Sequence, residues 1–214
     1  MTKPSLRLVS PASRLRTVVA KAMPTRKPNS EYRPREHLAE HEVKALIASA
    51  KKNRWGHRDA TMILVMWRHG QRVSEVCDLE WAEVDFKDGT LNLRRAKGGD
   101  PGTHYLQGDE MRALRTLKRD QEERQIKSRY VFISERGDPF TRAGVAKMIE
   151  RAGEAAKLPF PVHAHMLRHA CGYALASRGV DTRTLQAYLG HKSIHSTTRY
   201  AAIAPGRFKN IWAK

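Results

Sequence analysis

The fold is decided by one stretch near the C-terminal end, residues 163–200, which reads H-A-H-M-L-R-H-A-C-G-Y-A-L-A-S-R-G-V-D-T-R-T-L-Q-A-Y-L-G-H-K-S-I-H-S-T-T-R-Y. Residues three apart share a helix face, so His165 and Arg168 would project together. Leu167 and Cys171 would lie on the apolar face that packs on the core. One helix face would then carry a fixed cation beside a group that can transfer a proton.

Two more helices are predicted after this one. Asp181 or Thr182 can cap the first of them, and Gly190 should end it. His191 follows that glycine directly. A third, short helix should end near Tyr200, so a tight turn can bring His191 and Tyr200 to the same site.

The side chains of this stretch suit the chemistry of a phosphodiester. A guanidinium is a planar fork of donors that matches phosphate oxygens, an imidazole donates or accepts a proton near neutral pH, and a phenol can act as a nucleophile. The alternative is a metal site at His165 and His169, which are one helical turn apart. Arg168 disfavours a dication there, and Met166 stands where a zinc protease carries glutamate, so no metal is expected.

Simpler roles exist for two of these residues taken singly. Tyr200 alone would suit a packing residue with a hydrated hydroxyl, and His191 alone would suit a cap at a helix end. Their joint spacing with Arg168 is what favours a catalytic site over these structural roles.

Composition points to a polyanionic partner. The 214 residues carry a formal net charge of +18, and so positive a surface repels itself unless it binds a polyanion. Nucleic acid is the leading candidate. An anionic membrane would require a long basic amphipathic helix with aromatic anchors, whereas the charges here are spread along the chain. We therefore expect a nucleic acid as partner and no membrane association.

Cysteine usage and hydropathy indicate the compartment. Cys77 and Cys171 both fall within predicted helices, which fits buried thiols in a reducing compartment better than a disulfide framework. No run of eighteen apolar residues is present. A soluble, cytoplasmic protein is expected.

The chain is predicted to have two parts, a basic flexible arm at residues 1–35 and one domain at residues 36–214. Residues 1–30 hold seven basic residues, four prolines and no acidic residue. Such an arm can follow DNA phosphates, or it can be a solvated tail. A transit peptide is the other reading, but the prolines interrupt the amphipathic helix that it needs.

A further candidate site residue, Arg72, lies after two apolar helices, predicted from about residue 40 and at about residues 57–68. Gly70 breaks the second helix, and a short helix then carries Arg72 and Glu75. An arginine at a helix start beside a buried helix is held in place, and the carboxylate of Glu75 can fix its rotamer. The alternative is a surface salt bridge between the two.

A β-hairpin follows. T-L-N-L-R-R-A alternates like a strand, G-G-D-P-G suits a turn, and T-H-Y-L-Q can return as the paired strand. Lys97 lies at its tip, and Arg94 and Arg95 precede it. These three cations can also be a phosphate-contacting edge without chemistry. With helices predicted at about residues 108–124 and after Thr141, and a short strand at 130–133, the fold class is mainly α with a small antiparallel hairpin or sheet.

The pattern H-x-x-R, then L-G-H, then a tyrosine nine positions later resembles the catalytic domain of the tyrosine recombinase (phage integrase) family. The run G-x-R-x-S-E around Arg72 resembles the first arginine box of that family. The resemblance covers residues 36–214 and implies the fold of that domain, a site-specific DNA recombinase activity and no cofactor. The residues that fill the catalytic positions of the family are Arg72, Lys97, His165, Arg168, His191 and Tyr200, with Glu75 in support and Arg94, Arg95 and Arg199 as DNA contacts.

The resemblance also implies a role for each of these residues. Arg72, Arg168 and His191 would bind the phosphate, Tyr200 would attack it, Lys97 would act as general acid, and His165 would assist proton transfer.

The short plan of the chain looks most like that of the small bacterial recombinases that invert the fimbrial promoter switch. Most of the family carries a separate helical DNA-binding domain before the catalytic one, and here only the arm precedes it. The family implies double-stranded DNA as partner, a tetramer on paired sites, a C-terminal tail that docks on a neighbouring subunit, and accessory DNA-bending proteins. It also implies a bacterial, nucleoid-associated protein of the cytoplasm. A type IB topoisomerase and a DNA-binding regulator without chemistry are the alternative functions.

Overall fold

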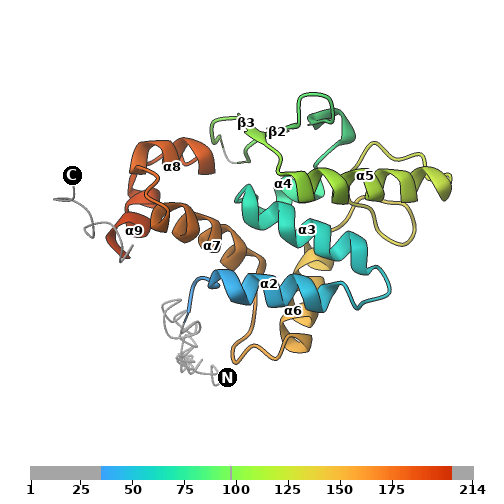
Figure 1. Ribbon diagram of the computed structural model, residues 1–214, viewed down its shortest axis with the longest axis horizontal. Coiled ribbons are helices and arrows are strands. Elements are labelled where there is room, and N and C mark those ends of the chain that lie inside the picture. Colours follow the sequence, from blue (N-terminus) through green and yellow to red (C-terminus); the bar gives the residue numbers. More distant parts are fainter. Residues whose placement is uncertain (1–34, 97, 204–214) are drawn as a thin grey trace, which may run out of the picture. The chain divides into compact units, whose positions relative to one another are not determined.

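The structure is a computed structural model that describes residues 35–96 and 98–203, with only the backbone of residues 201–203. The predicted arm therefore lies outside the described residues except for Arg35, and so do Lys97 and the tail after residue 203. The described part is mainly helical with one small sheet, as expected (Figure 1). Its elements are α2 (Glu40–Ala50), α3 (Gly56–Arg68), α4 (Val73–Cys77), the 3-10 helix η1 (Trp81–Glu83), β1 (Val84–Asp85), β2 (Thr90–Leu93), β3 (Gly102–Tyr105), α5 (Gly108–Glu123), α6 (Arg142–Ala155), α7 (Ala164–Ser177), α8 (Thr182–Leu189) and α9 (His195–Ile203).

Helix α3 is the centre of the core, as its composition predicts. Met62, Ile63, Val65 and Met66 are fully buried, because apolar residues occupy nearly every side of this helix. It packs against α2, α5 and α7 (Figure 1). The C-terminal end of α3 is thereby fixed beside α7, the helix that carries the H-x-x-R motif.

The sheet has three antiparallel strands in the order β1-β2-β3. The expected hairpin is present, with Leu91 opposite His104 and Leu93 opposite Gly102. Strand β1 was not predicted because it is only two residues long. The strand predicted at 130–133 was wrong: Tyr130 pairs with Glu80 and Ile133 with Pro139 through isolated bridges, so no single partner extends a ladder.

Local capping explains where the site helices begin and end. The Thr141 hydroxyl accepts from the Gly144 amide at 3.0 Å at the start of α6. Asp181 caps α8 by accepting from the amides of Arg183 and Thr184 at 2.9 and 3.0 Å. Gly190 ends α8 with a left-handed φ of 62°. These predicted boundaries are confirmed, and His191 emerges directly from the last of them.

Across the described ranges, none of the helices is both long and apolar enough to cross a bilayer.

Candidate functional site

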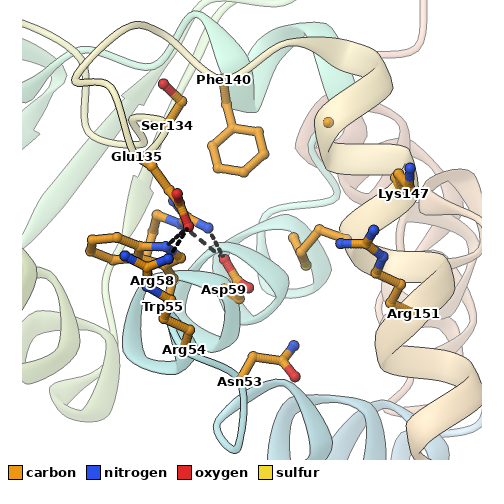
Figure 2. A pocket seen from close by; sticks show the side chains of 12 residues that line it. Asn53, Arg54, Trp55, Arg58, Asp59, Ser134, Glu135, Phe140, Lys147 and Arg151 are labelled. Atoms are coloured by element: carbon orange, nitrogen blue, oxygen red, sulfur yellow. Dashed lines mark hydrogen bonds and ion pairs between the residues drawn. The ribbon is translucent and has the colours of Figure 1, made fainter.

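A basic pocket lies between the start of α3, the loop around residue 135 and α6 (Figure 2). The guanidinium of Arg58 lies 4.6 Å from the centre of the Phe140 ring and bonds to Asp59 at 2.7 Å. None of the described residues predicted for catalysis lines this pocket, so it is a surface distinct from the motif site. It is lined by Asn53, Arg54, Trp55, Arg58, Asp59, Ser134, Glu135, Phe140, Gly144, Lys147, Met148 and Arg151.

The motif residues meet elsewhere, where α3, α4, α7, α8 and the hairpin come together. Arg72 precedes α4, and its guanidinium donates to Glu75 at 2.6 Å. The backbone amide of Arg72 donates to the same carboxylate at 3.0 Å. Burial raises the pKa of Glu75, but the hydrogen bonds from Arg72 and the charge of Arg95 outweigh it, so the pKa lies below its ordinary value. The pair is not the alternative surface salt bridge, because the Glu75 side chain is only 2% exposed.

Arg168 joins the ends of two helices. From the first half of α7 its guanidinium donates to the Gly70 carbonyl just after α3, and to the Leu189 carbonyl at the end of α8 at 2.6 Å. Helix C-termini leave carbonyls without partners, so a buried cation is stabilised there. Burial together with the charge of Arg72 lowers the pKa of Arg168 to about 10, which still leaves the guanidinium charged at neutral pH.

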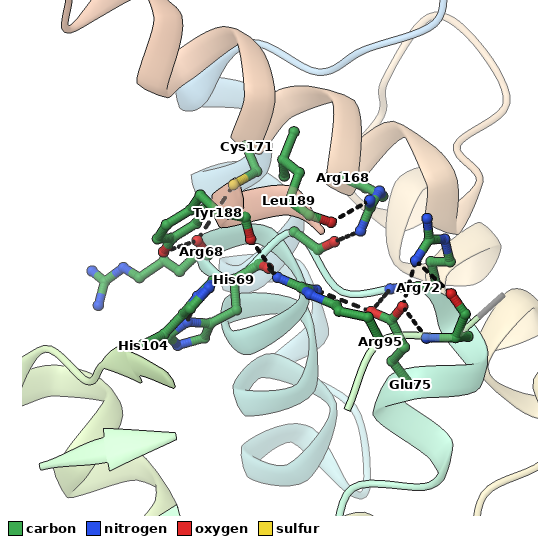
Figure 3. A network of polar contacts seen from close by, with 12 residues as sticks. Arg68, His69, Arg72, Glu75, Arg95, His104, Arg168, Cys171, Tyr188 and Leu189 are labelled. Atoms are coloured by element: carbon green, nitrogen blue, oxygen red, sulfur yellow. Dashed lines mark hydrogen bonds and ion pairs between the residues drawn. The ribbon is translucent and has the colours of Figure 1, made fainter. Parts of the chain in front are cut away.

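Arg95 differs from the surface phosphate contact expected of it. Its side chain is 1% exposed. It donates to Glu75 at 3.0 Å, to the His69 carbonyl at 3.0 Å and to the Tyr188 carbonyl at 2.6 Å (Figure 3). A guanidinium with these partners has no surface left for DNA. We call Arg72, Glu75, Arg95 and Arg168 the guanidinium cluster.

His165 lies at the start of α7, and the residue is exposed to solvent. Desolvation of its ring, which packs on the ring of His169 at 4.5 Å, and the charge of Arg168 lower the pKa of His165 to about 4. The imidazole is therefore neutral at pH 7 and able to accept a proton.

His191 is buried directly after α8. Its Nδ1 atom lies 2.8 Å from the hydroxyl of Thr197, which is fully buried. Burial, followed by the charges of Arg168 and Arg72, lowers the pKa of His191 to about 4. These charges act on His191 because the turn after Gly190 directs it toward the guanidinium cluster, as the sequence predicts.

Tyr200 is 1% exposed and lies on α9 beside α7. Its ring is parallel to that of His191, with centroids 6.3 Å apart, and edge-on to that of Tyr173 at 5.0 Å. A Cβ on Gly172 would lie 2.7 Å from the Tyr200 ring, so only glycine leaves room for it. Burial raises the pKa of Tyr200 to about 12. We call His169, Gly172, Tyr173 and His191 the Tyr200 seat.

His169 is a site residue that sequence reasoning considered only as a metal ligand. Its Nδ1 atom lies 2.9 Å from the Tyr200 hydroxyl. Burial, followed by the charge that His165 would carry, lowers the pKa of His169 to about 3, so the ring is neutral and can accept the phenol hydrogen. Only the spacing of one helical turn from His165 hinted that His169 shares its helix face.

Within the described ranges, no group of three or more His, Cys, Asp or Glu residues could hold a metal ion.

Three predicted residues remain to be placed: Arg94, Arg199 and Lys97. The Arg94 side chain is 70% exposed and pairs with Glu83 at 2.6 Å. The Arg199 side chain is 48% exposed and lies 3.5 Å from Glu36. Lys97 lies outside the described residues. The structure therefore brings five of the six predicted catalytic residues into one region, with Arg94 and Arg199 on the surface.

The chain is similar to known proteins over most of its length. The model of the phage integrase family matches residues 36–207. Type 1 fimbriae regulatory protein FimE of Escherichia coli (strain K12) is 40% identical over 182 residues, which cover 84% of this chain and 92% of FimE. The crystal structure of XerA recombinase matches with a TM-score of 0.72 at 26% identity, covering 87% of this chain and 68% of that one. A lambda integrase tetramer bound to a Holliday junction shares the fold, with a TM-score of 0.61 at 22% identity over 77% of this chain and 47% of that one.

The chain belongs to the phage integrase family. The expected catalytic-domain fold is confirmed, and so is the expected enzyme class, a tyrosine-type site-specific DNA recombinase. Within that class, its likeness to FimE extends over most of both chains.

Proposed function

We propose that the protein cuts and rejoins duplex DNA at paired recombination sites through a 3′-phosphotyrosine intermediate. Arg72 and Arg168 bind the non-bridging oxygens of the scissile phosphate and stabilise the charge that develops on them. The observation that carries the proposal is a convergence: Glu75 holds Arg72, Arg168 joins the ends of α3 and α8, and Tyr200 lies beside His191.

The cleavage step uses the phenol as nucleophile. The Tyr200 oxygen bonds to phosphorus, and the bond from phosphorus to the 5′ oxygen of the next nucleotide breaks. The phenol proton passes to the neutral imidazole of His165, and the ammonium of Lys97 gives a proton to the leaving 5′ oxygen. The products are a 3′-phosphotyrosine and a 5′ hydroxyl. The new linkage is still a phosphodiester, so religation by that hydroxyl needs no nucleotide cofactor.

His191 is suited to donate to the phosphate. If the buried Thr197 hydroxyl donates to Nδ1, the ring proton lies on Nε2. The low pKa of His191 keeps the ring neutral at pH 7, so one ring nitrogen carries a proton while the other accepts one. Nε2 then offers a hydrogen bond to a non-bridging oxygen beside the two arginines.

The site must open before it reacts. Arg168 and Tyr200 are each 1% exposed, and the Tyr200 hydroxyl is engaged with His169. A DNA phosphate can reach these groups only after the segments that cover them move. Displacement of α9 is the simplest such movement, because α9 carries the nucleophile and follows the turn that begins at His191.

The test uses DNA with a nick next to the scissile phosphate, which releases a short fragment and traps the covalent product. The purified protein should form an adduct that migrates slowly on a denaturing gel, and Tyr200→Phe should abolish it. No adduct on any candidate site would favour the non-catalytic regulator. An adduct that forms without paired sites, together with relaxation of supercoils, would favour the topoisomerase.

The finer assignment is inversion of a promoter segment by a tetramer on two sites. Support comes from the likeness to a fimbriae regulatory protein and from the fold shared with a lambda integrase tetramer. In this proposal Arg94 and Arg199 contact DNA, residues 1–35 form a basic arm, and residues 36–214 form the catalytic domain. A C-terminal tail docks on the neighbouring subunit, DNA-bending proteins assist, and the protein works on the nucleoid in the cytoplasm. Mapping the recombination junctions in DNA tests the direction of the reaction.

A further inference from the structure

Two buried arginines connect the same two helix ends through adjacent carbonyls. Arg168 bonds to the carbonyls of Gly70 and Leu189, and Arg95 bonds to those of His69 and Tyr188. The carbonyl partners are thus consecutive in sequence both after α3 and at the end of α8. Arg168 belongs to the catalytic motif, whereas Arg95 comes from the hairpin and has no part in the proposed reaction.

Arg95 also shares its carboxylate partner with a catalytic residue. Glu75 accepts from Arg95 with Oε2 and from the guanidinium of Arg72 with Oε1. The backbone amide of Ala96, the residue next to Arg95, donates to Oε1 at 3.0 Å. Arg95 and Ala96 therefore both bond to Glu75 of α4, and these two residues directly precede Lys97 in the sequence.

The loop after this anchor is seated on the end of α8 by close backbone approach. A Cβ on Gly99 would lie 2.5 Å from the Gly190 carbonyl oxygen, and a Cβ on Gly190 would lie 2.7 Å from Cγ of Arg95. The chain is thus held on both sides of Lys97, by Arg95 and Ala96 before it and by Gly99 after it.

Burial alone does not explain why position 95 carries a charged side chain. Removing a guanidinium from water is costly, and an apolar side chain of similar size often stabilises a core equally well. What an apolar side chain cannot do is bond to a carboxylate and two carbonyls at once, which needs the fixed fork of a guanidinium.

We propose that Arg95 is a positioning residue, which holds the loop of Lys97 against the ends of α3 and α8 so that the general acid meets the leaving oxygen. This inference rests on the proposed function, because it takes Lys97 as the proton donor. Arg95 touches neither DNA nor the reacting atoms. Its loss should therefore slow the protonation of the leaving group more than any other part of the reaction.

The experiment replaces the leaving 5′ oxygen by sulfur. A thiolate is a much weaker base than an alkoxide and departs without a proton donor, so the sulfur substrate bypasses general acid catalysis. Single-turnover cleavage of nicked oxygen and sulfur substrates is measured for Lys97→Ala, Arg95→Met and Arg95→Lys. The Arg95 variants should cleave the oxygen substrate about 10²-fold more slowly than the unaltered protein, and sulfur should restore most of that loss, as for Lys97→Ala.

A matched control separates positioning from loss of stability. Gln121 is another buried bridge: it accepts from the Trp81 indole at 3.0 Å and donates to the Val131 carbonyl at 2.8 Å, away from the site. Gln121→Met should lower the melting temperature without any difference between the two substrates. Arg95→Lys keeps a long charged chain, so a folded variant remains for study if Arg95→Met unfolds. Circular dichroism sets an assay temperature at which each variant is folded.

Each outcome is decisive. If sulfur rescues Lys97→Ala but neither Arg95 variant, or if the Arg95 variants cleave the oxygen substrate at the normal rate, the positioning role is overturned while the proposed function stands. If sulfur does not rescue Lys97→Ala, Lys97 is not the proton donor and this inference falls with it. The phosphotyrosine adduct of Tyr200 would still be tested separately by its own variant.

Discussion

The guanidinium cluster and the Tyr200 seat are both buried, but they are held in different ways. In the cluster, Glu75 and four backbone carbonyls occupy two buried guanidiniums, and several segments of the chain supply these bonds. In the seat, the hydroxyl of Tyr200 bonds to His169, and among the described residues its ring contacts the rings of Tyr173 and His191 and the backbone at Gly172.

This difference separates a preformed part of the site from a movable one. Donors that bind the charge of a transition state work best when they are fixed before the reaction. A nucleophile can instead rest in a buried, unreactive position, provided that the contacts that hold it there can be broken when DNA binds. Releasing Tyr200 costs a hydrogen bond and ring contacts worth about 1 kcal/mol each, and the burial of its ring, about 1.5–3 kcal/mol. Moving the cluster would instead leave buried charges and helix-end carbonyls without partners, so Tyr200 is the part that can move.

The largest effect is expected from removing the nucleophile. Tyr200→Phe should abolish the covalent DNA adduct and lower the free energy of unfolding by only about 1 kcal/mol, because it loses one hydrogen bond. Denaturing gels measure the adduct, and urea unfolding measures the stability. Tyr105→Phe is the control, since Tyr105 is 77% exposed. An adduct that survives in Tyr200→Phe would remove the seat from the reaction altogether.

The next effect concerns the cluster. Lysine cannot bond to both helix ends at once, so Arg168→Lys should slow cleavage by about 10²- to 10³-fold and lower the free energy of unfolding by about 1–3 kcal/mol. Arg72→Lys should slow cleavage similarly with a smaller loss of stability, because its side chain is 23% exposed. Single-turnover cleavage and urea unfolding distinguish the two variants. Equal losses of stability would show that the cluster is not organised around the ends of α3 and α8.

A substitution under the Tyr200 ring tests the seat. Gly172→Ala would place a methyl group 2.7 Å from two ring atoms. We expect a loss of about 1–3 kcal/mol from overpacking and a fall in the pKa of Tyr200 from about 12 toward its ordinary value as the ring leaves its site.

Ultraviolet titration, with Tyr200→Phe as the reference, follows that phenol. Gly108→Ala is the matched control, since its Cβ would meet only the flexible end of Arg112 at 3.4 Å. An unchanged tyrosine titration in Gly172→Ala would mean that the seat is as rigid as the cluster.

The smallest effect is a dependence of stability on pH. Burial holds the pKa of His169 at about 3 and that of His191 at about 4, below the value of 6.5 for a free histidine. Both groups are neutral in both states above pH 6.5. As the pH falls from 6.5 toward 4, the unfolded chain binds protons that the folded chain does not, so stability falls. His169 alone should account for about 2 kcal/mol at pH 5.

Urea unfolding at pH 7 and pH 5 measures this loss. His169→Gln should remove about that part of the pH dependence, and His41→Gln, at an exposed histidine, is the control. Glu75 has a lowered pKa, so its contribution is present above pH 4.5 and is lost only below it. The same loss between pH 7 and 5 in both histidine variants would contradict the assignment to the seat.

Much of the site could be predicted because its information is local. Helical spacing placed His165 with Arg168, and the caps at Asp181 and Gly190 fixed where His191 would emerge. The resemblance to the recombinase family joined these segments to Arg72, which is far away in sequence. Partners that come only from tertiary packing could not be predicted in this way, such as the contact between His169 and Tyr200, which are 31 residues apart.

The burial of Arg95 shows a signal that was available and not used. Leu91 and Leu93 are buried on β2, and alternation with a period of two continues this inward face to Arg95 and leaves Arg94 outside. The sequence does not show what would satisfy a charge on that face. Its carbonyl partners belong to helix ends that only the fold brings to the hairpin.

The glycines at 99 and 190 bear on any attempt to retarget this enzyme to new DNA. A methyl group on Gly99 would lie 2.5 Å from the Gly190 carbonyl oxygen, and one on Gly190 would lie 2.7 Å from Cγ of Arg95. Such variants would disturb the seating of the hairpin loop whatever bases they recognised. A mutant library aimed at specificity should therefore leave both positions unchanged and vary exposed residues of α6 or the surface arginines instead.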